Sequence, residues 1–409
     1  MKRTVFTRIT FRAISVVVLI AFVAAGAFKV GFWMGTGQLA AVASAAPSQQ
    51  GTTEANVPGF PVFWEAWNYV EQQFYGQVPA AQQRVYGAIR GMVNSYGDQN
   101  TAFLDPTQAA IFQQDVSGSF EGIGAVVRLD DMNRVTIAQA YPGRPAAAAG
   151  LLGGDVIVAV NGQSLDGMSL YDVISLIRGP AGTRVTLSIL RQGETRPFDV
   201  VVTRAHIDIQ VVTSKRLDGD IGYVSLSEFS RGASQKLTDA IRGLEAQGPL
   251  KGLVFDLRNN PGGLLDEGVS VASQFIDQGT ITLEREKGGQ QTVFNAQPGG
   301  VALQVPLAVL VNAGSASASE IVTGAIRDHH RGELVGERTF GKGTVQIPHT
   351  LSDGSELRVT IAEWLTPNGD EINHQGITPD IVVPMTQADF AAGKDPQLDR
   401  AVQYLTEGK

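Results

Sequence analysis

Cysteine is absent from this 409-residue chain, and histidine is scarce, with five residues. Without thiols the chain has no disulfides, no thiol catalysis and no metal site built from cysteine ligands. The histidines lack the spacing of metal ligands, so neither a metal nor another cofactor is expected; they are His206, His329, His330, His349 and His374. His329 and His330 close an expected helix, where the helix dipole favours a cation.

Positive charge is also in short supply. Forty acidic residues face 32 basic ones, which gives a formal net charge of −8. Non-specific binding to phosphate backbones needs a basic surface, so no nucleic acid partner is expected. At the usual size of roughly 100–200 residues per domain, the chain has room for two or three domains.

Long hydrophobic runs are confined to the N-terminus. Four basic residues precede the uncharged run 13–28, and 30–34 extend it past Lys29. This pattern predicts a basic tip and transmembrane anchor, or signal sequence, over 1–35, with the rest of the chain periplasmic or extracellular. A cleaved signal peptide is the alternative, because 43–45 read Ala-Ser-Ala, and it would give a secreted protein. That site lies well beyond the run, which favours a single-pass anchor in the cell membrane.

Two segments follow before any strand is expected. Residues 36–57, rich in Gly, Ala, Ser and Gln, predict a flexible linker. Residues 58–115 predict a helical region, because apolar residues recur at helical steps from Phe63 to Met92. These helices could pack on the rest of the chain or on a second copy, as a homodimer.

A small β-rich domain is expected over 116–206. Short apolar strands alternate with turns, a helix interrupts them at 169–177, and Asn161-Gly162 is a strong tight-turn pair. From 207 to 385 the order becomes strand, helix, strand, with fully apolar strands at 252–256 and 307–311 and helices at 231–246, 264–277 and 317–330. That order predicts an α/β core with a buried, largely parallel sheet. A C-terminal helical tail is expected over 386–409.

Two polar turns follow strands of this sheet, at 259–263 and 312–317, where ligands of such sheets collect. In the second turn small residues lead into a helix, so the hydroxyl of Ser317 would lie near free N–H groups that favour negative charge. The alternative is that Ser315, Ser317 or Ser319 only caps the helix, with Glu320 completing a capping box.

Lys342 lies between two glycines, 25 residues after Ser317. Residues 336–342 fit the start of a phosphate-binding loop, but Gly343 stands where Ser or Thr is needed and a strand follows instead of a helix. A lysine buried beside a serine would have a lowered pKa and could take the hydroxyl proton as a neutral amine. Gln346 falls on the same face of the extended segment and could orient that amine.

Several motifs in this order resemble the carboxyl-terminal processing peptidases, or tail-specific proteases. The resemblance covers roughly 60–385 and rests on Phe120–Gly124, Ile177–Thr183, Asp256–Gly263, Gly314–Glu320, Gly341–Gln346, Leu365–Gly369 and Gly376–Asp380. One departure is Asp98-Gln99-Asn100-Thr101, where the family has a shorter acidic-proline turn.

The resemblance implies a Ser-Lys endopeptidase with a crotonase-like α/β core, an inserted PDZ domain and an N-terminal helical segment. Ser317 would be the nucleophile, Lys342 the general base and Gln346 its orienting partner. The oxyanion hole would be formed by backbone N–H groups of Ala318 and of Gly262 or Gly263.

The PDZ domain implies substrates that are proteins or peptides with free C-termini. A Gly-Ile-Gly turn can aim N–H groups at a carboxylate, so Gly122, Ile123, Gly124 and Val126 are expected to bind the peptide. Arg178, beyond the helix at 169–177, could bridge to the peptidase body as a regulatory residue, or could be a solvated arginine. The alternative to a membrane-tethered peptidase is a catalytically silent PDZ scaffold, which would not need Ser317, Lys342 and Gln346 together.

Overall fold

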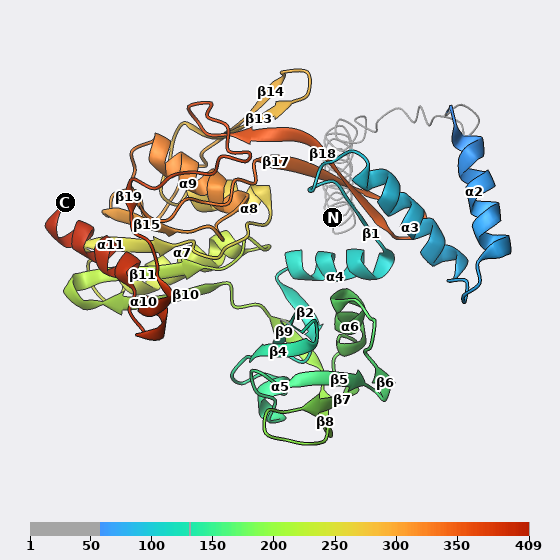
Figure 1. Cartoon of the computed structure of the whole chain (residues 1–409). Helices are drawn as coiled ribbons and strands as arrows, with labels where there is room; N and C mark the ends of the chain where they lie inside the picture. The colour runs from blue at the N-terminus through green and yellow to red at the C-terminus, as the bar shows by residue number, and fades with distance from the viewer. Residues whose placement is uncertain (1–57, 131, 409) are drawn as a thin grey trace, which may run out of the picture. The chain divides into compact units, whose positions relative to one another are not determined.

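The computed structural model describes residues 58–130 and 132–408 (Figure 1). The chain divides into two compact units, 1–79 and 80–409, each described by itself. In the first unit the described helix is α2 (Phe60–Gln73), whose Phe60, Phe63 and Trp64 rings pack on one another while exposed to solvent. The expected anchor or signal at 1–35 and the linker at 36–57 lie outside the described residues. No helix of the described part is long and apolar enough to cross a membrane.

A small β-rich module forms in the second unit, as expected. Its main sheet has the order β3-β4-β5-β7-β8, with β6 paired to β5 and with β2 and β9 paired separately. The elements are β2 (Ser119–Gly122), β3 (Ala125–Leu129), β4 (Val135–Ala140), α5 (Pro145–Ala148), β5 (Val156–Val160), β6 (Gln163–Ser164), α6 (Leu170–Ile177), β7 (Arg184–Leu190), β8 (Phe198–Thr203) and β9 (Ala205–Asp208).

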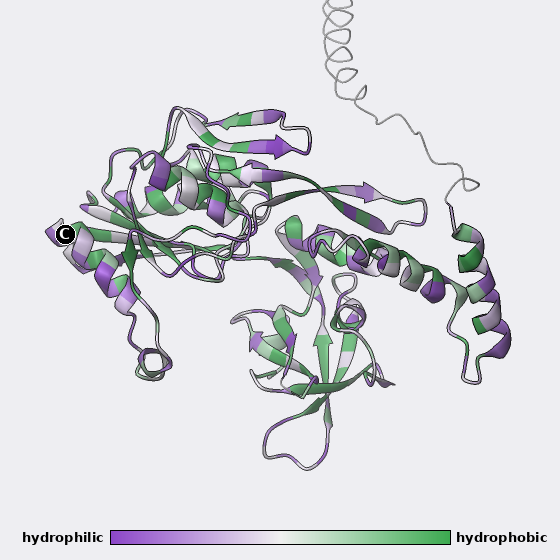
Figure 2. Cartoon of the chain, turned by 45° about the horizontal axis from the view of Figure 1, so that its top comes forward, coloured by the Kyte–Doolittle hydropathy of each residue, from purple (hydrophilic) through white to green (hydrophobic). Residues whose placement is uncertain are grey.

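Local sequence explains this module. Asn161 and Gly162 join β5 to β6 with φ angles of 50° and 78°, the two positive values that a type I′ hairpin turn requires. Along β7 every second side chain is buried, starting from Val185. Figure 2 shows that the strands of this module are rich in hydrophobic residues. Helix α6 begins with a capping box between Ser169 and Asp172 and closes one side of the core.

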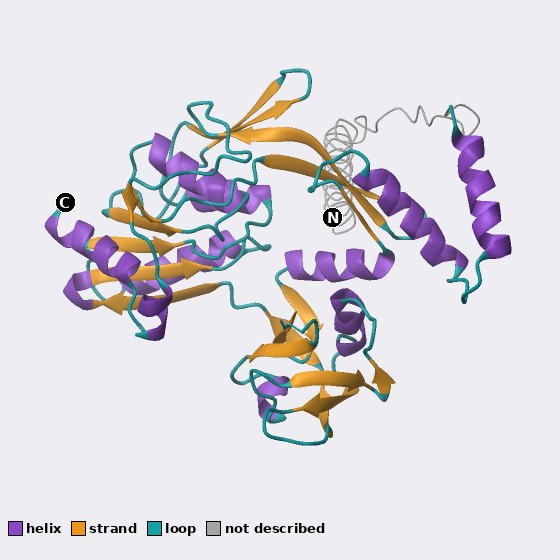
Figure 3. Cartoon of the chain, in the orientation of Figure 1, coloured by secondary structure: helices purple, strands orange, loops and turns teal. Residues whose placement is uncertain are grey.

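The α/β core carries the predicted parallel strands. Its sheet has the order β10-β11-β12-β15-β16-β19, parallel from β11 onwards. Helices α7, α8 and α9 pack on one face and α11 on the other, so the middle strands are buried throughout (Figure 3). The elements are β10 (Val212–Leu217), η1 (Asp218–Asp220), β11 (Ile221–Leu226), α7 (Ala233–Glu245), β12 (Gly252–Asp256), α8 (Leu265–Ala272), β15 (Leu307–Val311), α9 (Ala318–Asp328), β16 (Glu333–Gly336), β19 (Ile381–Val382), α10 (Gln387–Ala391) and α11 (Pro396–Glu407).

A second, antiparallel sheet has the order β1-β18-β13-β14, with β17 paired to β18. The strands are β1 (Ala102–Leu104), β13 (Thr280–Glu286), β14 (Gln291–Asn295), β17 (Thr344–Thr350) and β18 (Glu356–Leu365). Sequence patterns identified the start of β17 but not this sheet. Strand β18 pairs with β1 and β13, which are far from it in the chain, and the half-exposed surfaces of β17 and β18 carry mixed side chains.

The predicted helical region from Phe63 to Met92 contains two helices, α2 and α3 (Ala81–Asn94). A third, α4 (Pro106–Val116), begins with a capping box at Asp105. In the loop that departs from the family pattern, the Asp98 carboxylate accepts hydrogen bonds from the Asn100 and Thr101 amides and the Thr101 hydroxyl. Those donors stabilise the ionised form and lower the pKa of Asp98 against the opposing effect of burial.

The C-terminal segment is tied to the sheet through Arg258, just after β12. Its guanidinium contacts the Asp256 carboxylate at 2.7 Å and binds both oxygens of Asp395, at 2.8 and 2.9 Å. The Tyr223 hydroxyl donates to Asp256 at 2.8 Å, and burial together with this carboxylate raises the pKa of Tyr223 to about 12. Each buried charge in this group therefore has an opposite charge beside it.

Candidate active site

Ser317 occupies a strained turn between the buried strand β15 and helix α9. Its φ and ψ are 56° and −117°, a region that residues with a side chain rarely adopt. The 259–263 loop lies directly against it, since a Cβ added to Gly262 would come within 2.7 Å of the Ser317 Cβ. Such a turn aims a hydroxyl at the end of a sheet, the geometry of a nucleophile.

The two neighbouring serines have structural roles. The buried Ser315 hydroxyl donates to the Leu257 carbonyl at 2.8 Å, and the buried Ser319 hydroxyl donates to the Asn260 carbonyl at 2.9 Å. Both bonds fasten the 257–263 loop to the start of α9. Ser317 is therefore the serine best placed for chemistry, although it also begins the helix, as the capping alternative expected.

Glu320 is fully buried, and its carboxylate joins the serine turn to the lysine loop. One oxygen, Oε2, accepts the backbone N–H groups of Ser317 and Lys342 at 2.9 and 2.8 Å. The other, Oε1, accepts the Thr339 hydroxyl at 2.6 Å and the Gly341 N–H at 2.7 Å. Burial raises the pKa of Glu320, and the donors around the carboxylate oppose that shift.

Sequence analysis gave Glu320 only a capping role. The signal available was its position three residues after Ser317, which predicts the bond to the Ser317 N–H. Nothing in the sequence pairs it with the Lys342 loop. Those contacts arise from the return of the chain after β16.

Lys342 is half buried in the loop before β17. Burial is the largest cause of its lowered pKa, the nearby Arg358 guanidinium acts in the same direction, and Glu320 opposes them. The flanking glycines are needed here, since a Cβ on Gly343 would meet the Asn373 backbone N at 2.3 Å. The loop is thus pressed against a neighbouring segment, which keeps the lysine partly out of water.

The backbones of Ser317 and Lys342 are brought close together because both N–H groups donate to the same Glu320 oxygen. Within residues 58–130 and 132–408 no hydrogen bond joins the Ser317 hydroxyl to the Lys342 amine. Lys342 faces a cavity of about 230 Å³ that it shares with Gln346. The Gln346 amide donates to the hydroxyls of Thr344 and Thr360, at 2.7 and 3.3 Å. A register shift between Val345 and Gln346 breaks the simple alternation that placed Gln346 and Lys342 on one face.

The three candidate oxyanion-hole amides are not equivalent. The Gly262 N–H donates to the Asn260 side chain at 2.9 Å, so it is already engaged. The N–H groups of Gly263 and Ala318 have no hydrogen-bond partner in the described part of the chain. Gly263 must be glycine, because a Cβ there would lie 2.4 Å from the Phe229 carbonyl oxygen. The available pair is therefore Ala318 and Gly263.

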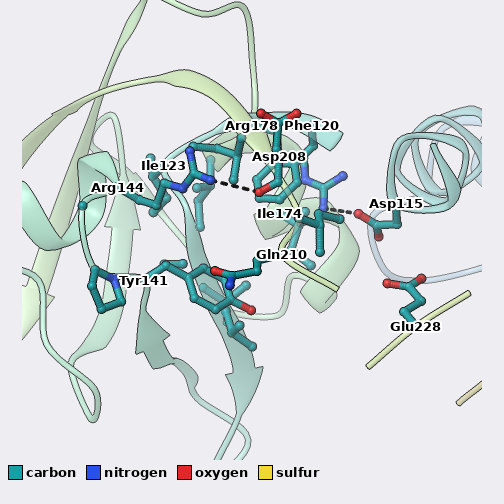
Figure 4. Close-up of a pocket in the computed structure, with 18 residues that line it drawn as sticks. Asp115, Phe120, Ile123, Tyr141, Arg144, Ile174, Arg178, Asp208, Gln210 and Glu228 are labelled. Carbon is teal, nitrogen blue, oxygen red and sulfur yellow. Dashed lines mark hydrogen bonds and ion pairs between the residues drawn. The ribbon is translucent and has the colours of Figure 1, made fainter. Parts of the chain in front are cut away.

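A groove of about 710 Å³ lies beside the β-rich module (Figure 4). Ile123 and Val126 line it together with Ile174 and Ile177 of α6, the residues and helix that the sequence indicated. Gly124 forms the turn into β3 with a φ of 71°, while Gly122 belongs to β2 and pairs with β9.

Arg178 links this groove to helix α4. Its guanidinium contacts the Asp115 carboxylate at 2.6 Å, shown as a dashed line in Figure 4, and lies 4.4 Å from the centre of the Phe120 ring. The Arg178 side chain is mostly buried, so the alternative of a solvated arginine is wrong. Asp115 was not identified from the sequence, since a lone acidic residue on a helix carries no specific signal.

No cluster of three or more potential metal ligands occurs among the described residues. At the end of α9, His329 forms a hydrogen bond with the Thr280 carbonyl oxygen through Nε2, at 2.7 Å.

Comparison with known proteins places these features in a family context. Residues 220–383 match the model for peptidase family S41, and residues 136–191 match a PDZ domain. A carboxy-terminal-processing protease of Bartonella bacilliformis is 38% identical over 79% of this chain and 75% of its own. The carboxy-terminal processing protease CtpA of Bacillus subtilis is 38% identical over 83% and 71%, respectively. The structure of a photosystem II D1 C-terminal processing protease is 34% identical, with a TM-score of 0.51 over 80% of this chain and 94% of that one.

Replacing Glu320 with Gln tests the bridge between the serine turn and the lysine loop. An amide has one acceptor oxygen where the carboxylate has two. Depending on its orientation, either the N–H groups of Ser317 and Lys342 or the Thr339 hydroxyl and the Gly341 N–H would face an NH₂ group. At ~1–3 kcal/mol for each unsatisfied donor, we expect about 2–6 kcal/mol of lost unfolding free energy and at least a tenfold loss of peptidase turnover. Denaturant unfolding and casein hydrolysis measure both.

The matched control is Glu245→Gln, the same change at an exposed position at the end of α7. It should leave both quantities unchanged. Wild-type turnover in a stable Glu320→Gln protein would contradict the bridging role.

Proposed function

Because the chain belongs to the carboxy-terminal processing proteases of peptidase family S41, and is therefore a serine-type peptidase, we propose that Ser317 is its nucleophile and Lys342 its general base. The observation that carries the proposal is the shared Glu320 Oε2, which accepts the backbone N–H groups of both residues. Two segments that meet at one buried carboxylate supply a hydroxyl and an amine of lowered pKa. Family membership also removes the reason for considering a catalytically silent scaffold.

In acylation, the Ser317 oxygen attacks the carbonyl carbon of the scissile peptide bond while its proton passes to the neutral Lys342 amine. Negative charge on the carbonyl oxygen is stabilised by the N–H groups of Ala318 and Gly263, both without an internal partner. The lysine ammonium then gives its proton to the departing peptide nitrogen. In deacylation, water repeats these steps and releases the second fragment.

Lysine can act as a base only as the neutral amine, so partial burial of Lys342 serves the reaction directly. The side chains of Ser317 and Lys342 must move into hydrogen-bond contact when substrate binds. Catalytic hydrogen bonds are often long in the absence of substrate and shorten in the complex. Gln346 lines the same cavity as the lysine, and its carbonyl oxygen can accept a hydrogen bond from that amine. Gln346 therefore orients the base.

Substrate selection falls to the PDZ domain. Gly122 is paired with β9, so the turn at Ile123 and Gly124 presents the backbone N–H groups to the terminal carboxylate, and β3 beyond Val126 pairs with the extended peptide. The apolar lining of the groove suits small or apolar C-terminal side chains. The substrates are therefore unstructured proteins with free C-termini.

The N-terminal sequence supports a location at the cell membrane. A basic tip and apolar run at 1–35 would anchor it to the cell membrane, with the catalytic domain outside the cytoplasm. Exposed aromatic residues on α2 offer a surface for a homodimer. Sizing of the detergent-extracted full chain would test both ideas.

The Ser-Lys mechanism is tested by Lys342→Arg. Arginine keeps the charge but does not deprotonate near neutral pH, so we expect kcat/KM to fall by about 10³-fold or more, as in Ser317→Ala. In the wild type, activity should rise as pH climbs through the lowered lysine pKa, because only the neutral amine is active. Lys251→Arg, an exposed lysine paired with Asp220, is the control and should behave as wild type. More than about a tenth of wild-type turnover in folded Lys342→Arg would rule the mechanism out.

Recognition of the C-terminus is tested with paired peptides. A peptide ending in a free carboxylate behind an apolar residue should be cleaved several-fold faster than its amidated twin, because an amide carries no charge for the N–H groups of the turn. Val126→Glu, at a groove-lining position that is exposed, places a like charge in the groove and should remove that preference. Equal rates for the two peptides with the wild-type enzyme would count against PDZ-mediated selection.

Arg178 is proposed to couple the PDZ domain to the peptidase body, through its ion pair with Asp115 on α4. Arg178→Ala should lower turnover of long protein substrates several-fold, since binding in the groove would no longer be transmitted through this contact. Arg184→Ala, an exposed arginine on β7, is the matched control. Wild-type turnover of both long and short substrates by Arg178→Ala would show that the coupling role is wrong.

A further inference from the structure

The cavity of about 230 Å³ beside Lys342 has an unusual charge pattern. Two cations line it, Lys342 and Arg358 of β18, and its other lining side chains include Phe112, Tyr171 and Gln346. No carboxylate belongs to this lining within the described residues. Two positive charges therefore face one small, partly enclosed space.

Arg358 is held there by packing, not by a strong ion pair. Its guanidinium lies 4.0 Å from the centre of the Phe112 ring on α4, a cation–π contact. The nearest carboxylate, Glu356, approaches Nε only to 3.5 Å, and neither Nε nor the Glu356 Oε1 has a hydrogen-bond partner in the described part of the chain. The other Glu356 oxygen accepts the Gln113 amide at 3.0 Å. The charge of Arg358 is thus poorly neutralised.

Arg285, on β13 of the same sheet, is different. Its guanidinium lies 2.8 Å from Glu363 and 2.6 Å from Glu371, so two carboxylates neutralise it. It does not line the cavity beside Lys342. Arg285 therefore has two carboxylates within hydrogen-bond distance, whereas the carboxylate nearest to Arg358 lies 3.5 Å away.

Two cations in one cavity repel each other, and only one of them can lose its proton. Arginine stays charged in proteins, whereas lysine becomes neutral when buried near a like charge. Resting on the function proposed above, we infer that Arg358 is a positioning residue of the peptidase site, whose charge keeps Lys342 as the neutral amine that accepts the serine proton.

The other groups around Lys342 agree with this inference. From α9 the Glu320 carboxylate favours the protonated lysine, and from α6 the titratable group is the Tyr171 phenol. Burial and Arg358 together outweigh Glu320, so the lysine pKa is lowered. Without Arg358, burial alone would oppose the effect of Glu320, and the pKa of Lys342 would rise.

Arg358→Gln removes the charge while keeping a polar side chain of similar length. We expect the acid limb of the kcat/KM profile to move by about one pH unit toward higher pH, the ordinary size of such effects. On that limb the variant should be about tenfold slower than wild type, and above it the two should converge. Arg285→Gln removes a charge on β13 that does not line the cavity, so it should leave the limb in place.

A second measurement does not depend on turnover. In a Ser317→Ala background, the rate at which an amine-reactive acetylating reagent labels Lys342 is followed against pH by peptide mass spectrometry. The midpoint should rise by about one unit when Arg358 is Gln, and should stay in place when Arg285 is Gln. Arg358→Met, which can still lie on the Phe112 ring, replaces Gln if that variant does not fold.

The inference would be overturned if Arg358→Gln lowered the plateau of kcat/KM without moving its acid limb, or if the labelling midpoint of Lys342 did not move. Arg358 would then have only a structural role. The same holds if Arg285→Gln shifts the limb as far as Arg358→Gln does. Failure of the proposed function is seen separately, as activity retained by Lys342→Arg. In that case the labelling midpoint still reports whether Arg358 acts on Lys342.

Discussion

The buried Glu320 carboxylate is the interaction on which the rest of the site depends. An isolated carboxylate with no exposed surface would be strongly destabilising, and the hydrogen bonds of four donors offset that penalty. Its two oxygens hold the backbone of the serine turn and the backbone of the lysine loop. The backbone of the turn is strained, with a φ of 56° at Ser317, and the lysine loop is flanked by glycines. Both segments therefore depend on the hydrogen bonds to Glu320.

Around this carboxylate the site is built from loops that follow buried strands. β12 leads to the 259–263 loop and β15 to the serine turn, while the lysine loop follows β16. Because these strands are parallel, all three loops leave the same edge of one rigid sheet. The side-chain hydroxyls of Ser315 and Ser319 fasten the first two loops together. These hydrogen bonds and the shared sheet edge therefore fix the positions of the loop backbones relative to one another.

The features that sequence alone predicted are those with a local physical signature. Continuous apolar runs indicated β12 and β15, and Asn161-Gly162 indicated the β5–β6 hairpin, because each pattern depends on neighbouring residues. The roles proposed for Ser317 and Lys342 came from their motifs. Choosing Gly263 over Gly262 required the hydrogen bond from Gly262 to Asn260, and the surroundings of Gln346 required the register shift in β17. Glu320 and Arg358 act through partners far away in the chain, which a local pattern cannot reveal.

The ion pairs of Arg258 affect the order in which the 259–263 loop gains its supports during synthesis. Arg258 begins the loop that ends in Gly263, and its second carboxylate, Asp395, is 137 residues further along the chain. During synthesis Arg258 can pair with Asp256 at once, but its second carboxylate is added only when the chain reaches Asp395. The support of this loop is therefore complete only after the segment beyond β19 has been made. A molecule that stops before Asp395 would leave the loop without its second carboxylate.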